Sequence, residues 1–173
     1  MSIIRYVLRT IVPVACAVLC QSCGIYSFSG TSIQPDIRSF TVEYMQYKAL
    51  RVNPSLSNDL TEALMDQFRR FTRLEQVEMD GDLVISGEIT GYDVKAMAIT
   101  ANETAAQNRL TVTVKIYFTN NKYPDEDFDE GKSFSAYADF DATQLLDSVE
   151  PTLCEEIIDK LVEDIFNATV ANW

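Results

Sequence analysis

Cysteine side chains offer the first chemistry in this sequence, because three of the four lie close together near the N-terminus. Cys16, Cys20 and Cys23 lie in or just after an apolar run at residues 11–19. The segment before this run carries two arginines and no acidic residue. A basic start, an apolar run too short to span a bilayer and a cysteine behind a small residue are typical of a lipoprotein signal peptide.

Cys23 is the best candidate for the lipid-modified cysteine. It has small neighbours on both sides, whereas Cys20 follows the bulky Leu19, and Cys16 would leave an unusually short apolar run. One feature departs from the usual pattern, since Cys20 stands three residues before Cys23, where leucine is common. We expect cleavage before Cys23 and acylation of its thiol, and cleavage without lipid is the alternative.

The expected cleavage site divides the chain into three parts. We predict a signal peptide at residues 1–22, a lipidated tether at 23–35 and a single domain at 36–173, large enough to bury a core without crosslinks. After cleavage only Cys23 and Cys154 remain. Because the first would carry lipid, no disulfide can form within the mature chain. The apolar neighbours of Cys154 favour a buried thiol, and a reactive thiol is the alternative.

The charge of the chain excludes several classes of function. The net charge is −12 at pH 7, and loss of residues 1–22 would leave 12 basic against 26 acidic residues, or −14. Such an acidic chain is not expected to bind nucleic acid. The chain has no histidine, so the commonest general base and the commonest zinc ligand are missing. We therefore expect no enzyme, no metal site and no cofactor.

Two groups of side chains are candidates for contact with a partner or ligand. Arg69, Arg70 and Arg73 fall in the last turns of a predicted helix. They could be a solvated basic end that opposes the helix dipole, or a local phosphate site in an acidic protein. The second candidate is a polar segment between two predicted strands, formed by Gln107, Asn108 and Arg109.

Alternating aspartates at 125–129 resemble the start of a calcium loop. However, the sixth position of that loop is Glu130 instead of glycine, and the twelfth is Ala136 instead of glutamate. A solvated acidic hairpin therefore explains this segment better.

Hydrophobic periodicity predicts four strands and two helices that would position these groups. The strands are expected at residues 37–46, 83–98, 110–119 and 133–140, and the helices at 53–74 and 148–168. Asn53 and Ser148 suit the N-caps of the two helices, with Pro54 and Pro151 in their first turns, and Gly91 is expected to mark a kink.

The order β-α-β-β-β-α predicts an α+β domain. The three later strands have short connections and should form an antiparallel meander, and both helices need a sheet face for their apolar stripes. We expect a two-layer sandwich with two helices on one face of a four-stranded sheet. The other face could be solvated or meet a partner. It would carry Thr111, Thr113, Lys115, Tyr117, Ser133, Ser135 and Tyr137.

Several short segments, in a fixed order along the chain, carry a resemblance to a known family. They are Cys23-Gly24-Ile25-Tyr26-Ser27-Phe28, Val52-Asn53-Pro54-Ser55-Leu56-Ser57, Gly87-Glu88-Ile89-Thr90-Gly91-Tyr92, Ala105-Ala106-Gln107-Asn108-Arg109-Leu110-Thr111, and Glu163-Asp164-Ile165-Phe166-Asn167 with Asn172-Trp173. With these segments the chain resembles the LptE family of lipopolysaccharide-assembly lipoproteins, in a branch unlike the enterobacterial one. The resemblance covers nearly the whole mature chain.

The resemblance implies an outer-membrane lipoprotein on the periplasmic side, with two helices on a four-stranded sheet. Members of the family bind inside the lumen of the LptD β-barrel, help it fold and assist delivery of lipopolysaccharide. The low content of basic residues departs from what direct binding of anionic lipopolysaccharide would favour, so no ligand-binding residue is carried over. The alternative function is a periplasmic lipoprotein that binds a small ligand or a cell-wall component.

Overall fold

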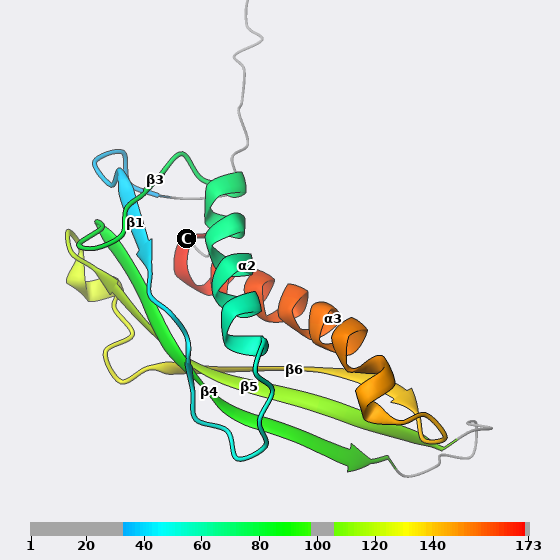
Figure 1. The fold of residues 1–173 in the computed structure, drawn as a ribbon. Helices are drawn as coiled ribbons and strands as arrows, with labels where there is room; N and C mark the ends of the chain where they lie inside the picture. Colours follow the sequence, from blue (N-terminus) through cyan, green and yellow to red (C-terminus); the bar gives the residue numbers. More distant parts are fainter. Residues whose placement is uncertain (1–32, 98–105, 172–173) are drawn as a thin grey trace, which may run out of the picture.

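The computed structural model describes residues 33–97 and 106–171, and Cys23 with the predicted signal peptide lies outside this part. The described residues form one curved, mixed sheet and two long helices, α2 (Leu56–Phe71) and α3 (Leu146–Phe166). Both helices lie on the same side of the sheet (Figure 1). A π-helical turn, Asn167–Ala171, continues α3. The α+β class and the placement of both helices on one face are therefore confirmed.

Three long strands form the predicted antiparallel meander. β4 (Leu83–Ala96) pairs with β5 (Gln107–Asn120), and β5 pairs with β6 (Lys132–Asp141). Buried and less buried side chains alternate along β5 and β6, because one face of the sheet meets the helices. The register of β4 against β5 shifts between Ile89 and Gly91, which confirms the kink expected near Gly91.

The predicted count of four strands is wrong, because the described residues form six. β1 (Ser39–Val42) runs parallel to β4 on one side and to β3 (Glu75–Gln76) on the other. β2 (Gln46–Tyr47) also runs parallel to β4. β2 and β3 have two residues each, and a segment this short cannot show the alternation by which strands are recognised in a sequence.

The strand expected at residues 37–46 is interrupted. Its alternation predicted that Tyr44 would be buried, but this side chain is 61% exposed and Met45 is buried instead. The backbone N–H of Met45 donates to Oγ1 of Thr61 on α2, at 3.1 Å. Because the chain turns toward α2 here, the strand divides into β1 and β2.

The helices differ from their predicted bounds at all four ends, since α3 itself ends at Phe166 and a π-helical turn follows it. α2 begins at Leu56, two residues after Pro54, and ends at Phe71, whose side chain is 57% exposed. α3 begins at Leu146, so Ser148 is not its N-cap; the Ser148 hydroxyl donates to the Leu145 carbonyl at 2.7 Å within the first turn. Pro151 consequently lies in the second turn of α3.

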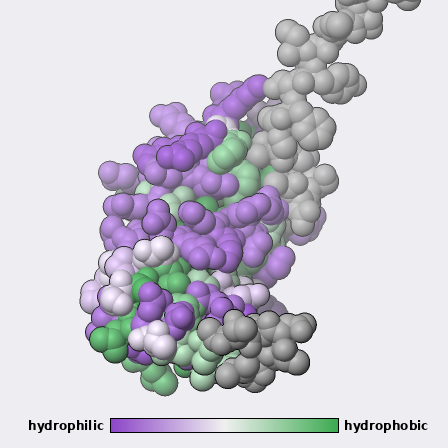
Figure 2. Space-filling view, turned by 90° about the vertical axis from the view of Figure 1, so that its right-hand side faces the viewer, coloured by the Kyte–Doolittle hydropathy of each residue, from purple (hydrophilic) through white to green (hydrophobic). Residues whose placement is uncertain are grey.

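Apolar side chains fill the space between the helices and the sheet. Phe40 of β1 stacks on Phe68 of α2, with ring centroids 5.3 Å apart, and Phe68 meets Phe166 of α3 edge to face at 5.2 Å. Dense packing of this kind leaves little room for a ligand inside the domain. Hydrophilic side chains cover most of the face seen in Figure 2, and hydrophobic ones gather toward its lower end. No helix within residues 33–97 and 106–171 is both long and apolar enough to cross a bilayer.

Candidate partner-contact surfaces

The sheet surface turned away from the helices is the first candidate, and we call it the open face. The residues predicted for it alternate along β5 and β6 with buried core residues, so their predicted orientation is confirmed. They are Thr111, Thr113, Lys115, Tyr117, Ser133, Ser135 and Tyr137. The hydroxyls of Thr113 and Ser135 lie 3.1 Å apart, and Lys115 Nζ lies 5.2 Å from the centre of the Tyr117 ring. This face therefore combines aromatic rings with hydroxyl groups.

Arg109, one of the predicted contact residues, is bound within the domain. Its Nε and one terminal nitrogen donate to the two oxygens of Asp139, at 2.7 and 2.8 Å. Its guanidinium carbon lies 3.6 Å from the centre of the Tyr137 ring. The hydrogen bonds from Arg109 hold the pKa of the Asp139 carboxyl below its usual range. Gln107 is exposed and Asn108 is half-buried at the start of β5.

The three predicted arginines do not form a site with this segment, and Arg73 lies two residues beyond the end of α2 instead of in its last turns. Figure 1 places the C-terminal end of α2 at the opposite end of the domain from the start of β5. Arg69 pairs with Asp66 one turn earlier on the same helix. Arg70 and Arg73 are exposed, and Arg73 lies beside a shallow groove of about 320 Å³ near Phe71. The predicted contact residues thus belong to two separate places.

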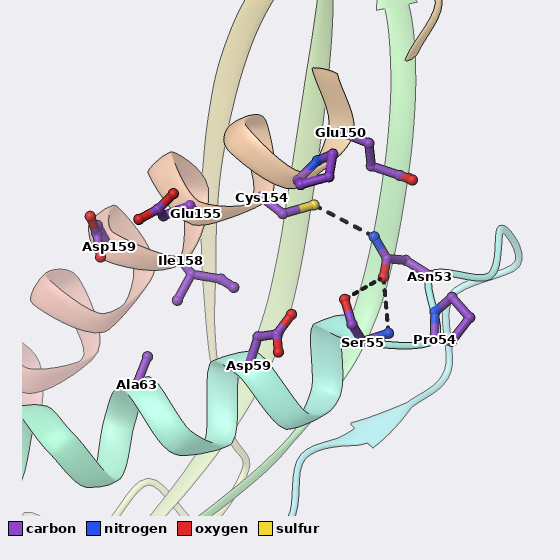
Figure 3. A pocket seen from close by; sticks show the side chains of 11 residues that line it. Asn53, Pro54, Ser55, Asp59, Ala63, Glu150, Cys154, Glu155, Ile158 and Asp159 are labelled. Atoms are coloured by element: carbon purple, nitrogen blue, oxygen red, sulfur yellow. Dashed lines mark hydrogen bonds between the residues drawn. The ribbon is translucent and has the colours of Figure 1, made fainter. Parts of the chain in front are cut away.

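A cleft of about 630 Å³ lies between α2 and α3 (Figure 3). Ala63 of α2 and Cys154 and Ile158 of α3 contribute its apolar lining. Carboxylates stand on both helices around it. They are Asp59 on α2 and Glu150, Glu155 and Asp159 on α3.

A polar network lies at one end of the cleft and joins both helices to the sheet. Asn53 Nδ2 donates to the Tyr92 hydroxyl and to Cys154 Sγ, each at 3.5 Å. The Tyr92 hydroxyl donates to the Glu150 carboxylate. Burial, aided by the Glu150 carboxylate, raises the pKa of Tyr92, and burial also raises the pKa of Cys154. Both groups are therefore protonated at neutral pH, and the prediction of a buried Cys154 thiol is confirmed.

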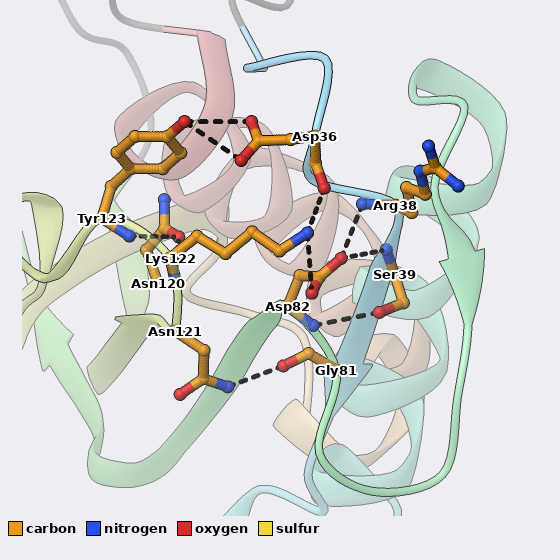
Figure 4. Close-up of polar contacts among 9 residues, drawn as sticks. All are labelled: Asp36, Arg38, Ser39, Gly81, Asp82, Asn120, Asn121, Lys122 and Tyr123. Carbon is orange, nitrogen blue, oxygen red and sulfur yellow. Dashed lines mark hydrogen bonds and ion pairs between the residues drawn. The ribbon is translucent and has the colours of Figure 1, made fainter.

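A second polar network fixes the beginning of the domain (Figure 4). Asp82 Oδ2 accepts the backbone N–H groups of Arg38 and Ser39, at 2.7 and 3.2 Å. Asp82 Oδ1 pairs with Lys122 Nζ at 3.2 Å, and Lys122 also donates to the backbone carbonyl of Asp36. These contacts hold the start of β1 against the turn that follows β5.

These arrangements are suited to contact with other molecules more than to bond-breaking chemistry. The chain has no histidine, and the buried Tyr92 and Cys154 hold their protons too tightly to act as a base or a nucleophile at neutral pH. Within the described ranges no three acidic or cysteine side chains are grouped so that they could hold a metal ion.

Sequence reasoning did not identify the cleft or the network beside it. From the sequence, Asn53 is expected only to cap a helix, and no role is expected for Glu150. The network joins residues about 40 to 100 positions apart, such as Asn53 with Tyr92 and with Cys154. Two local features of the sequence hint at this network. One is the polar Asn53 before an apolar helix, and the other is Tyr92 just after Gly91.

One family model matches most of the chain. The family model described as LptE, lipopolysaccharide-assembly, matches residues 37–169. No curated protein matches the chain. Among solved structures, a minor lipoprotein from Acinetobacter baumannii is similar at 13% identity, with 75% of this chain and 89% of that chain covered and a TM-score of 0.47. Uncharacterized lipoprotein B from Nitrosomonas europaea is similar at 10% identity, with 77% and 85% covered and a TM-score of 0.48.

Proposed function

The chain belongs to the LptE family of lipopolysaccharide-assembly proteins, and from this premise we propose that it is the lipid-anchored assembly partner of an LptD-like β-barrel in the outer membrane. In this role the domain occupies or braces the lumen of the barrel and promotes its assembly. One observation carries the proposal: the family match at residues 37–169 includes all six described strands and both long helices.

The open face supports this role. α2 and α3 lie on the other side of the sheet (Figure 1), and the outer side of β5 and β6 carries tyrosines and hydroxyl side chains of the kind found where proteins meet. The alternative role, binding of a small ligand, called for a cavity between the helices and the sheet. Apolar side chains pack that space instead, so the geometry favours a surface that binds another protein.

The anchor and the location complete the proposal. A signal peptide at residues 1–22 would direct export, and lipid on Cys23 would hold the domain at residues 36–173 on the periplasmic side of the outer membrane through the tether 23–35. A single acyl chain binds a membrane only marginally, so we propose more than one chain at this terminus. We further propose that the role is non-enzymatic.

Co-purification tests the partnership. The tagged lipoprotein should retain an LptD-like barrel, and its depletion should lower the amount of assembled barrel. Ser133→Arg with Ser135→Arg should reduce the retained barrel, because both positions lie on the open face and are exposed. Ala142→Arg with Gln144→Arg is the matched control, since both residues are exposed in the loop before α3. Normal barrel assembly in depleted cells would contradict the proposal.

A further inference from the structure

The cleft between α2 and α3 has an apolar floor and a charged rim. Cys154 and Ile158 are buried at its floor, whereas Asp59, Glu155 and Asp159 are exposed around it. Figure 3 shows Asp59 on α2 and the other two carboxylates on α3, across the gap from it. The cleft of about 630 Å³ is large enough to receive side chains from another molecule.

The rim carries negative charge without a basic neighbour. The four ion pairs in the described part of the chain use Asp66, Asp82, Asp139 and Glu156, and none involves the three rim carboxylates. Like charges that line one cleft repel one another, and they do so more strongly beside an apolar surface than in open water. An occupant with positive charge would remove this repulsion, so the cleft is complementary to a cation.

A lysine side chain fits this cleft better than a metal ion does. The carboxylates belong to no grouping of three that could hold a metal within residues 33–97 and 106–171. Lysine has a flexible apolar stem that can lie along Ile158 and Cys154, and its ammonium group can reach the carboxylates at the rim.

Two exposed aliphatic side chains lie in the segment that leads into the wall of the cleft. Leu50 and Val52 lie in the segment between β2 and α2, immediately before Asn53 and Pro54 at the cleft wall. Leu50 is fully exposed and Val52 is 73% exposed. Large aliphatic groups next to a polar rim are typical of protein interaction sites.

We propose that the α2–α3 cleft receives a segment of the barrel partner in which a lysine stands beside an apolar side chain. The lysine enters between Asp59 and the two carboxylates of α3, and the apolar side chain covers Leu50 and Val52. This inference rests on the proposed function, because it assumes that the barrel is the partner. It adds the α2–α3 cleft as a second surface for the barrel, apart from the open face.

Zero-length crosslinking with a carbodiimide tests the inference, because this reagent joins a carboxylate to an amine only when the two are in contact. The purified complex of the mature lipoprotein with its barrel is treated, digested and analysed by mass spectrometry. We expect an amide between a barrel lysine and Asp59, Glu155 or Asp159. The triple variant Asp59→Asn, Glu155→Gln, Asp159→Asn lacks the reacting carboxylates and cannot form this amide, so its binding is measured instead. It should retain at least about tenfold less barrel than the parent on co-purification.

A charge-matched control separates this contact from general electrostatics. The variant Asp125→Asn, Asp129→Asn, Glu130→Gln removes three acidic groups from the turn between β5 and β6 and should leave the amount of retained barrel unchanged. A parent complex without amides at the cleft overturns the inference, and so does an amide that joins two copies of this chain. If no barrel co-purifies with the lipoprotein before the reagent is added, the proposed function itself is contradicted. Failure of the inference and failure of the proposed function can therefore be told apart.

Discussion

Asp82 links parts of the chain that lie far apart in the sequence. Its carboxylate accepts backbone N–H groups from the start of β1 and pairs with Lys122 in the turn after β5. Together with Lys122, the N–H of Arg38 holds the pKa of this carboxyl below its ordinary value. The charged form is thus favoured in the folded state, and Asp82 should stabilise the attachment of β1.

Replacement of Asp82 should therefore have an effect that depends on pH. We expect Asp82→Ala to lower the free energy of unfolding by about 1–2 kcal/mol at pH 7, because two backbone donors lose their acceptor. The contribution is complete above the unfolded pKa of about 3.9 and disappears as the pH falls through the lower folded value. Urea unfolding at neutral and acidic pH measures the difference, with Asp129→Ala as an exposed control. An equal loss at both pH values would contradict a role for the charge.

Single residues also show the limit of sequence reasoning about sites. Arg109 was predicted to lie in a polar segment between two strands, but it is the third residue of β5. Its partner Asp139 is 30 residues away and becomes its neighbour only through the register of β5 and β6. Such a pairing depends on the register of two strands, which no local pattern reveals. The prediction for Cys23 stays a prediction, since that residue lies outside the described part.

At the scale of elements, the beginning of α2 illustrates how a helix is attached to the rest of the fold. Ser55 stands at the N-cap position, but its side chain makes no capping hydrogen bond. Asn53 supplies the acceptor instead: its Oδ1 receives the backbone N–H groups of Ser55 and Leu56, at 3.1 and 3.2 Å. The same amide donates to Tyr92 on β4 and Cys154 on α3. Asn53 therefore connects three elements.

Asn53→Ala and Ser55→Ala should consequently differ in stability. Removal of the Asn53 amide leaves two helix N–H groups and a buried network without their partner, at a cost of about 1–3 kcal/mol in the free energy of unfolding. Ser55→Ala should cost only a few tenths, because the Ser55 hydroxyl is exposed and donates only to Asn53. Thermal or urea unfolding of both variants provides the comparison. Similar losses would show that Ser55 is the effective cap.

Elements with a long periodic pattern could be predicted, and short ones could not. β5 and β6 alternate over ten residues or more, and β4 alternates from Leu83 to Ile89 before its register shifts, so the existence and pairing of these strands followed from the sequence. β2 and β3 are held by pairing with distant strands, and their own residues carry no pattern. The cleft was missed for a similar reason, since it exists only where two helices from opposite ends of the chain pass each other.

On the scale of the whole molecule, acidity is the dominant property. The chain carries −12 at pH 7, and the described ion pairs neutralise only four acidic side chains. Excess charge of one sign keeps a protein soluble and opposes its compact state. The acidic domain would also be repelled by an anionic membrane surface. The proposed lipid on Cys23 would then have to supply the attraction to the membrane that the domain itself lacks.

Self-repulsion predicts that salt stabilises the isolated protein. The melting temperature should rise by a few degrees between about 20 and about 300 mM sodium chloride, because the Debye length shortens. Sodium chloride is preferable to sulfate, which also strengthens the burial of apolar groups.

The cleft should contribute more to this repulsion than other acidic surfaces do, because its carboxylates line one cleft with an apolar floor. The triple variant Asp59→Asn, Glu155→Gln, Asp159→Asn should melt higher than the parent at low salt and respond less to added salt. The control variant Asp125→Asn, Asp129→Asn, Glu130→Gln removes the same charge from an exposed turn and should give a smaller gain. Differential scanning calorimetry of the three proteins at both salt concentrations measures these shifts. An equal rise in melting temperature in the two variants would mean that the repulsion is spread over the molecule. The cleft would then have no particular preference for a cation.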